Sequence, residues 1–157
     1  MIKVNVAEIK KRLVGQKTFA FDLTAEELEI SSKEIEILED VKTEGCISNA
    51  GDVLLLEATM STQVRRTCGR CLKEFTAVTK AEVLEKFYPA SADNIEKDAF
   101  VYDSDVLDIT EPLRESLLLA EPIQALCKED CQGLCAQFFL TFRPHRWIWS
   151  QAPFLCC

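Results

Sequence analysis

The sequence is poor in the residue types that most catalytic and nucleotide-binding motifs need. It holds a single histidine and five glycines among 157 residues. No G-x-S-x-G nucleophile motif, P-loop, H-E-x-x-H zinc motif or glycine-rich dinucleotide loop is present. With so few glycines, a loop that cradles phosphate with its backbone is not expected either. These absences argue against an enzyme and leave no small-molecule substrate in evidence.

Long apolar runs are also missing. The first fifteen residues, MIKVNVAEIKKRLVG, mix charges with single apolar positions and lack the apolar core of a secretory signal. Nowhere does an apolar run approach the roughly 20 residues that a membrane-spanning helix needs. We therefore expect a cytoplasmic protein that does not bind membranes, in a compartment where reducing conditions disfavour structural disulfides.

Positive charge is in deficit, with 18 lysines and arginines against 26 acidic residues and a net charge of −8. Proteins that grip RNA by its phosphates usually present a net-basic face. The balance therefore argues against broad RNA binding and favours a basic protein partner, although a local basic patch can still touch RNA. A hydrophobic content of 48% in a chain of this length is typical of one globular domain with a real core.

Apolar and polar residues alternate with a period of two along much of the chain. Between residues 54 and 64 the even positions are apolar or threonine and most odd positions are polar, as in a half-buried strand. A similar run covers residues 75–87, and the β-rich stretch 33–47 precedes both, before the turn signal NAGD at residues 49–52. This order predicts an antiparallel meander whose second turn is CGRC, residues 68–71. A further short strand is expected at residues 18–23.

Two segments carry helical signals. The spacing of Val6, Ile9 and Leu13 predicts a weak helix over residues 4–13. Residues 108–122 predict a second helix, capped by Asp108 or Thr110 and ended by Pro122. Its apolar stripe, which we expect to face the sheet, consists of Ile109, Leu113, Leu117 and Leu118. The expected fold is α+β, mainly an antiparallel sheet with one or two helices and a cysteine-rich, zinc-knuckle-like C-terminal element.

The composition changes abruptly at Ala136. Residues 136–157 contain no Asp, Glu or Lys, but hold both tryptophans, the histidine and four of the nine phenylalanines. A tail that binds a partner or touches a membrane is one interpretation. A shifted reading frame or another non-native end accounts better for the discontinuity. We therefore expect a single domain over residues 1–135, followed by an atypical apolar tail over 136–157 that is non-native or disordered.

The cysteines fall into two close groups. Cys68 and Cys71 share a tight turn, and Cys127 and Cys131 follow the second predicted helix, with Cys135 as an alternative ligand. Four thiolates suit a tetrahedral structural Zn²⁺, which is the interpretation we favour. Free thiols and a redox couple of Cys68 and Cys71 remain alternatives. A thioredoxin-like C-x-x-C precedes a helix, whereas this motif lies between two strands, which disfavours redox chemistry.

Basic residues concentrate around the first cysteine pair, at Arg65, Arg66, Arg70 and Lys73. They can form a solvated rim, or they can offset the negative charge of an all-thiolate zinc site. They can also contact nucleic-acid phosphates or a partner protein. The sequence alone leaves these roles open.

Three segments together resemble the bacterial YceD family of large ribosomal RNA subunit accumulation proteins. They are CGRCLKEF, DVLDITEPLRESLLLAEPIQALC and CKEDCQGLC, and the resemblance is most specific over residues 68–135. It implies a non-enzymatic role in the accumulation of 23S ribosomal RNA and in assembly of the large subunit. A ribosomal protein, large-subunit rRNA or both would be the partners.

The same resemblance extends to single positions. Arg70 and Leu72 match the family's knuckle, and the matching cysteines are Cys68, Cys71, Cys127, Cys131 and Cys135. The chain departs from the family at Phe138, where a further cysteine is usual, and at the adjacent Cys156 and Cys157. A second metal site that includes Cys135 is therefore not expected. A zinc-binding interaction module unrelated to ribosomes remains the competing class.

Overall fold

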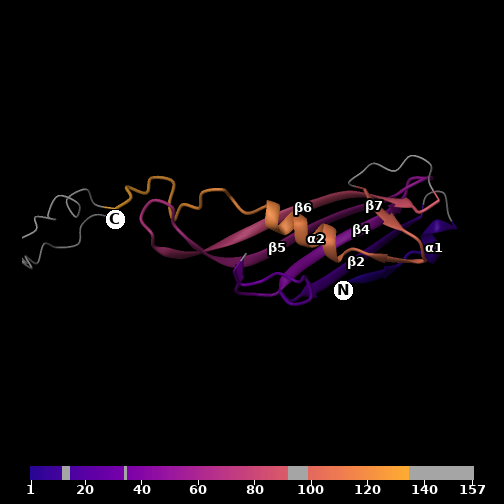
Figure 1. The fold of residues 1–157 in the computed structure, drawn as a ribbon, viewed down its shortest axis with the longest axis horizontal. Helices are drawn as coiled ribbons and strands as arrows, with labels where there is room; N and C mark the ends of the chain where they lie inside the picture. The colour runs from indigo at the N-terminus through magenta and orange to yellow at the C-terminus, as the bar shows by residue number, and fades with distance from the viewer. Residues whose placement is uncertain (12–14, 34, 92–98, 135–157) are drawn as a thin grey trace, which may run out of the picture.

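The computed structural model describes residues 1–11, 15–33, 35–91 and 99–134, and in these the fold is an elongated sheet with a helix across one face (Figure 1). The strands of the main sheet lie in the order β2–β4–β5–β6–β7, with β3 paired to β5. Their bounds are β2 Gln16–Leu23, β3 Glu36–Ile37, β4 Val41–Asn49, β5 Leu54–Thr67, β6 Glu74–Pro89 and β7 Phe100–Tyr102. The helix across the face is α2, Thr110–Leu119.

The predicted meander is confirmed. Strands β4, β5 and β6 are consecutive in the sequence and pair antiparallel with one another. The β5–β6 register runs without interruption from Leu54↔Phe87 to Thr67↔Glu74. Residues 68–73 therefore have to turn the chain at the end of the longest hairpin. The α+β class is confirmed as well, and the predicted turn at CGRC lies at this hairpin tip.

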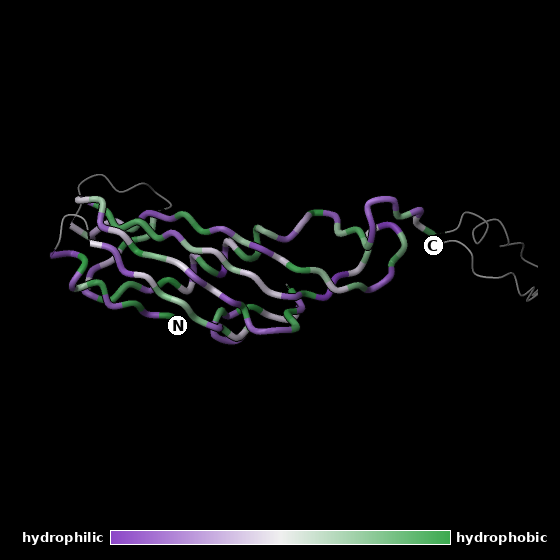
Figure 2. Tube along the Cα trace, turned by 180° about the vertical axis from the view of Figure 1, so that it is seen from behind, coloured by the Kyte–Doolittle hydropathy of each residue, from purple (hydrophilic) through white to green (hydrophobic). Residues whose placement is uncertain are grey.

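One face of the sheet forms the core. The even positions of β5 from Leu54 to Val64 are buried and the odd positions are not, because successive side chains of a strand point to opposite faces. Figure 2 shows hydrophilic and hydrophobic residues interspersed along the strands. The helix covers the buried face with Ile109, Leu113 and Leu117, which are fully buried, while Leu118 is only partly buried. In the described residues, neither helix has the length and apolar character needed to cross a membrane.

The helix predicted over residues 4–13 is confirmed at Ala7–Lys10 and is wrong at its start. Lys3–Asn5 form strand β1, which pairs antiparallel with β8, Val106–Asp108. Only Ala7–Lys10 are helical, as α1, and Leu13 lies outside the described residues. Ile2, Val4 and Val6 are all buried, and this period of two is the strand signal that the helical spacing concealed.

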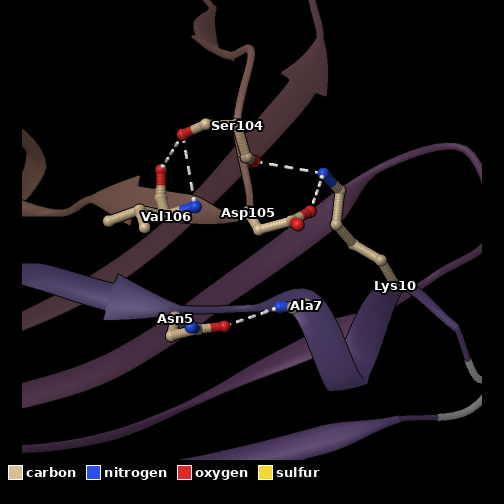
Figure 3. A network of polar contacts seen from close by, with 6 residues as sticks. All are labelled: Asn5, Ala7, Lys10, Ser104, Asp105 and Val106. Atoms are coloured by element: carbon tan, nitrogen blue, oxygen red, sulfur yellow. Dashed lines mark hydrogen bonds and ion pairs between the residues drawn. The ribbon is translucent and has the colours of Figure 1, made fainter.

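Polar contacts hold the N-terminal segment against the turn between β7 and β8 (Figure 3). The Lys10 ammonium donates hydrogen bonds to the Ser104 carbonyl at 3.1 Å and to the Asp105 carboxylate at 3.0 Å. The carboxamide oxygen of Asn5 accepts the N–H of Ala7, the first residue of α1, at 2.9 Å. The short helix therefore depends on a distant segment for its place rather than on its own propensity.

The sequence predicted Asp108 or Thr110 as the cap of α2, but the cap position is occupied by Ile109, and Asp108 supports the helix start from one residue earlier. Its carboxylate accepts hydrogen bonds from the Thr110 N–H at 3.0 Å and from the Thr110 hydroxyl at 2.6 Å. Partial desolvation raises the pKa of Asp108, but the two hydrogen bonds and the positive charges of the N-terminus and Lys3 together outweigh it, and the net pKa lies below its usual value of 3.8. The ionised form is therefore the one that the folded state prefers.

We expect Asp108→Ala to lower the free energy of unfolding by about 1 kcal/mol at neutral pH, because it removes the two hydrogen bonds that the carboxylate accepts from Thr110. Because the folded-state pKa is depressed, this contribution is complete above pH 3.8 and is lost as the pH falls below that value. Urea unfolding at pH 7 and pH 3 measures it. Asp103→Ala, in an exposed loop, is the control. A difference between wild type and Asp108→Ala that stays constant on acidification would contradict the assignment.

Candidate metal centre

Two chain segments meet at the tip of the β5–β6 hairpin. Cys68 directly follows β5, its N–H donates to the Lys73 carbonyl at 2.9 Å, and its carbonyl accepts the Leu72 N–H at 2.9 Å. These bonds close the turn and hold Cys68 and Cys71 on it. In Figure 1 the chain that follows α2 runs along the hairpin and reaches the same end. That chain carries Cys127 and Cys131.

The second segment is fastened to the hairpin tip by hydrogen bonds. The Gly69 N–H donates to the Ala125 carbonyl at 2.9 Å. The Arg70 guanidinium donates to the Cys131 carbonyl at 3.1 Å. Gly69 lies so close to Gln124 that a Cβ there would come within 3.0 Å of the Gln124 side chain. The two cysteine pairs are thus brought together by backbone contacts as well as by their own side chains.

The four sulfur atoms form one compact cluster. Those of Cys68, Cys71, Cys127 and Cys131 all lie within 4.8 Å of one another. The Sγ atoms of Cys68 and Cys131 are 3.7 Å apart, as are those of Cys71 and Cys127. Thiolates placed tetrahedrally at about 2.3 Å from one ion lie about 3.8 Å from each other. The arrangement therefore fits a metal ion and needs little adjustment to hold one.

The electrostatics of the cluster also favour a cation. Backbone N–H groups of Cys71, Cys127 and Arg70 point at the Cys68 sulfur and lower the pKa of Cys68 to about 6, although burial opposes them. Burial and the neighbouring thiols raise the pKa of Cys127 to about 12. For Cys131 the Gly133 N–H lowers the pKa, but burial and the thiols of Cys71 and Cys68 outweigh it, and the net pKa is raised. Without a cation, Cys127 and Cys131 therefore favour the neutral thiol form, and a bound cation would favour their thiolates.

Burial divides the four thiols into two kinds. Cys68 and Cys131 are buried, whereas Cys71 and Cys127 are half-buried. The alternative ligand Cys135 lies outside the described residues. Among the described cysteines, Cys46 stands apart on β4, where it pairs with Glu57 on the sheet face opposite the core. Four of the five described cysteines therefore belong to one site.

The four predicted contact residues do not form one surface. Arg65 and Arg66 are neighbours on β5 and so point to opposite faces of the sheet. Arg65 makes an exposed ion pair with Glu36 at 2.8 Å. Arg70 is bonded to the Cys131 carbonyl, and Lys73 is exposed at the hairpin tip. Any RNA or protein contact by these side chains involves separate faces of the molecule.

Arg66 has a role that the sequence did not suggest. Its guanidinium donates to both carboxylate oxygens of Glu121, at 2.8 and 2.7 Å, and to the hydroxyl of Thr79 at 2.7 Å. The Arg66 and Glu121 side chains are 14% and 24% exposed, so the pair is largely shielded from water. Glu121 begins the segment that leads to Cys127. The ion pair therefore ties the second cysteine segment to the sheet, and no local sequence signal marks Glu121 for this role.

Comparisons with known proteins agree with this organisation. The family model described as "Large ribosomal RNA subunit accumulation protein YceD" matches residues 56–139. The uncharacterized protein Rv2926c of Mycobacterium tuberculosis is 28% identical over 96 residues, which cover 58% of this chain and 46% of the relative. The uncharacterized protein YlbN of Bacillus subtilis is 26% identical over 118 residues, 73% of this chain and 69% of the relative. No solved structure matches significantly.

The extent of these matches bounds what they imply. The chain spans about half the length of the mycobacterial relatives it matches. The family match, by contrast, begins in β5 and continues through β6 and α2 to both pairs of clustered cysteines. Because that match covers more than half of the chain and includes the whole candidate metal centre, the chain belongs to the YceD family of large ribosomal RNA subunit accumulation proteins.

Proposed function

We propose that this chain is a non-enzymatic accessory factor, active in the cytoplasm, for the accumulation of 23S rRNA and the assembly of the large ribosomal subunit. Membership of the YceD family is the observation that carries this proposal. Residues 1–135 would act as one domain, and the apolar tail 136–157 would not be required. The partner would be a ribosomal protein, large-subunit rRNA or both.

The metal of the proposed factor is one structural Zn²⁺ held by Cys68, Cys71, Cys127 and Cys131. A cluster of four sulfurs is typical of a Zn²⁺ site or of an iron site. Zn²⁺ has no redox chemistry, and in structural sites it is coordinated tetrahedrally by four protein ligands. With four thiolates as ligands, no position is left open for substrate or water. The ion would therefore supply folding energy to the segment after α2 rather than chemistry. Cys135 stays the alternative ligand.

Net charge supports a basic protein as the main partner. The chain carries a net charge of −8, and ribosomal proteins that bind rRNA are basic because they neutralise phosphates. Arg65 and Arg66 already have carboxylate partners, whereas Lys73 and the exposed part of Arg70 stand at the hairpin tip. These two side chains are the best placed of the four to reach phosphate.

A thiol-redox function of Cys68 and Cys71 is the alternative, and the pKa of about 6 for Cys68 favours it. However, the Cys68 side chain is completely buried, and a reactive thiolate has to be reached by its substrate. The 3.7 Å sulfur contact of Cys68 is with Cys131 in the other segment. Disulfide reductase activity in the purified metal-free chain would restore the redox interpretation.

The proposed function is tested in a bacterial strain that lacks its own family member. We expect expression of this chain to restore the ratio of 23S to 16S rRNA. A variant with both Cys71→Ser and Cys127→Ser should restore less than half of the deficit, because it cannot form the metal site. Cys46→Ser is the matched control, since Cys46 lies outside the cluster. A wild-type chain that does no better than empty vector, in a strain where its native family member restores the ratio, would contradict the role.

A further inference from the structure

Leu72 adopts a backbone conformation that does not suit it. Its φ is +60°, in the left-handed region that leucine rarely enters and that glycine adopts without strain. The turn imposes this conformation, because the Leu72 N–H donates to the Cys68 carbonyl directly after the first cysteine pair. A glycine would close the same turn at lower cost. The turn therefore does not explain why a leucine stands at this position.

Burial in the core does not explain the leucine at position 72 either. The Leu72 side chain is 64% exposed, so it contributes little to the hydrophobic core. It follows Cys71 in the turn over residues 68–73 that closes the β5–β6 hairpin. The strained backbone costs folding free energy, and a side chain this exposed regains little of it by burial. Features of this kind persist where they serve binding.

Two further exposed apolar residues lie at the same end. Ile123 is fully exposed and lies two residues before Ala125, whose carbonyl accepts the Gly69 N–H of the hairpin tip. Leu134 is about half exposed and follows Gly133, where a Cβ would lie 3.4 Å from the Arg70 carbonyl. We call Leu72, Ile123 and Leu134 the apolar tip. Single exposed apolar residues are ordinary, but three on one small metal-held element point to a contact surface.

The charges around the apolar tip indicate what kind of partner fits it. The cations Arg70, Lys73 and Lys128 are balanced by the carboxylates of Glu74, Glu129 and Asp130. A divalent ion together with four thiolate ligands carries a net charge of −2. The end is therefore net negative when the metal is bound, as is the whole chain at −8. This balance opposes a phosphate backbone and suits a protein of opposite charge.

We propose that the apolar tip is the docking surface for a net-basic protein of the large ribosomal subunit, with Leu72 as its central contact. This inference rests on the proposed function. The proposed function allows a protein or an RNA as partner, and the inference selects a protein. The metal would contribute by holding Leu72 outward in its strained conformation. An apolar anchor that is already fixed loses little freedom on binding, so truncating it has a large effect on affinity.

The test is the affinity of the purified, metal-loaded chain for each purified basic protein of the large subunit and for protein-free 23S rRNA. We expect at least one of the proteins to bind, and Leu72→Gly to weaken that binding tenfold or more. Leu72→Asn is the second variant, because asparagine tolerates the left-handed region but removes the apolar surface. Both variants should keep their metal and show no loss of thermal stability.

The matched control is Leu84→Ala beside Leu72→Ala. Leu84 is 71% exposed on β6, similar to Leu72, but lies on the sheet face away from the core. We expect Leu84→Ala to bind within about twofold of wild type. A wild-type chain that binds one of the proteins while all three Leu72 variants bind equally well would overturn the docking surface alone.

Two other outcomes also overturn the inference. If only binding to 23S rRNA falls in the Leu72 variants, the tip is an RNA contact. If the wild-type chain binds none of the proteins, the surface is not a docking site for them. The proposed function is judged separately, by whether the wild-type chain restores the rRNA ratio. A wrong proposed function can therefore be distinguished from a wrong assignment of the apolar tip as a docking surface.

Discussion

Replacing Cys68 by serine is expected to remove the metal from the protein altogether. Elemental analysis of protein purified without chelator should find about one Zn²⁺ per wild-type chain, as a single tetrathiolate site requires. Cys68 is completely buried and its sulfur lies 3.7 Å from that of Cys131. A serine hydroxyl at this place is a much weaker ligand for Zn²⁺ than a thiolate. No metal should then be retained through purification.

Loss of the metal should also release the segment after α2. Structural zinc sites contribute about 10 kcal/mol or more to the folding of the segments they join. Within the described part of the chain, residues 122–134 form no helix or strand, and hydrogen bonds such as those from Gly69 to Ala125 and from Arg70 to Cys131 are weak compared with a metal site. We expect amide hydrogen exchange in this segment to become fast in Cys68→Ser, while β4 and the body of β5 stay protected.

Two controls make the metal measurement decisive. Cys46→Ser should keep a full complement of metal, because Cys46 lies on β4 outside the cluster. Cys135→Ser should keep it too if Cys127 and Cys131 complete the site. If Cys135→Ser loses the metal and Cys131→Ser retains it, the fourth ligand is Cys135 rather than Cys131. Absence of metal from the wild-type chain would leave the cluster as four thiols.

Arg66→Ala is expected to lower the free energy of unfolding by about 2 kcal/mol. Removing one partner of a fully buried ion pair costs about 3–5 kcal/mol, and the partial exposure of Arg66 and Glu121 reduces this figure. The substitution leaves the Glu121 carboxylate with one remaining hydrogen bond, from the Thr79 hydroxyl at 3.0 Å. Denaturant unfolding of the metal-loaded protein measures the change.

The neighbouring arginine is a close control for this prediction. Arg65→Ala also breaks a carboxylate ion pair, but that pair is exposed on both sides, and exposed pairs contribute about 0.5 kcal/mol. Because Glu121 begins the segment that carries Cys127, Arg66→Ala should in addition speed the removal of the metal by a chelator. Equal effects of the two substitutions on the free energy of unfolding would show that the Arg66–Glu121 pair stabilises the fold no more than the exposed Arg65–Glu36 pair does.

Elements with a strong local period were predictable. The alternation over residues 54–64 identified β5, because a strand with one buried face must place apolar residues at every second position. The same reasoning identified β6 and, from the apolar stripe at Ile109, Leu113 and Leu117, helix α2. The spacing of the cysteines placed the first pair on the turn between two strands, where the structure has it.

Short elements that depend on distant partners were not predictable. Strand β1 was taken for part of a helix, because three residues carry too little period to outweigh the spacing of Val6 and Ile9. Strand β7 pairs parallel with the end of β6 over three residues and was not expected at all. In both cases the pairing is chosen by the backbone groups that remain to be satisfied once the rest of the fold is in place.

The sequence by itself determined the strand periods, the hairpin that carries Cys68 and Cys71, and the set of thiols available to a metal. These features follow from local sterics and from spacing along the chain. Only the tertiary structure decided that Glu36 pairs with Arg65, that Glu121 pairs with Arg66, and that the two cysteine pairs meet. Such contacts join segments far apart in the chain, and packing rather than local preference selects them.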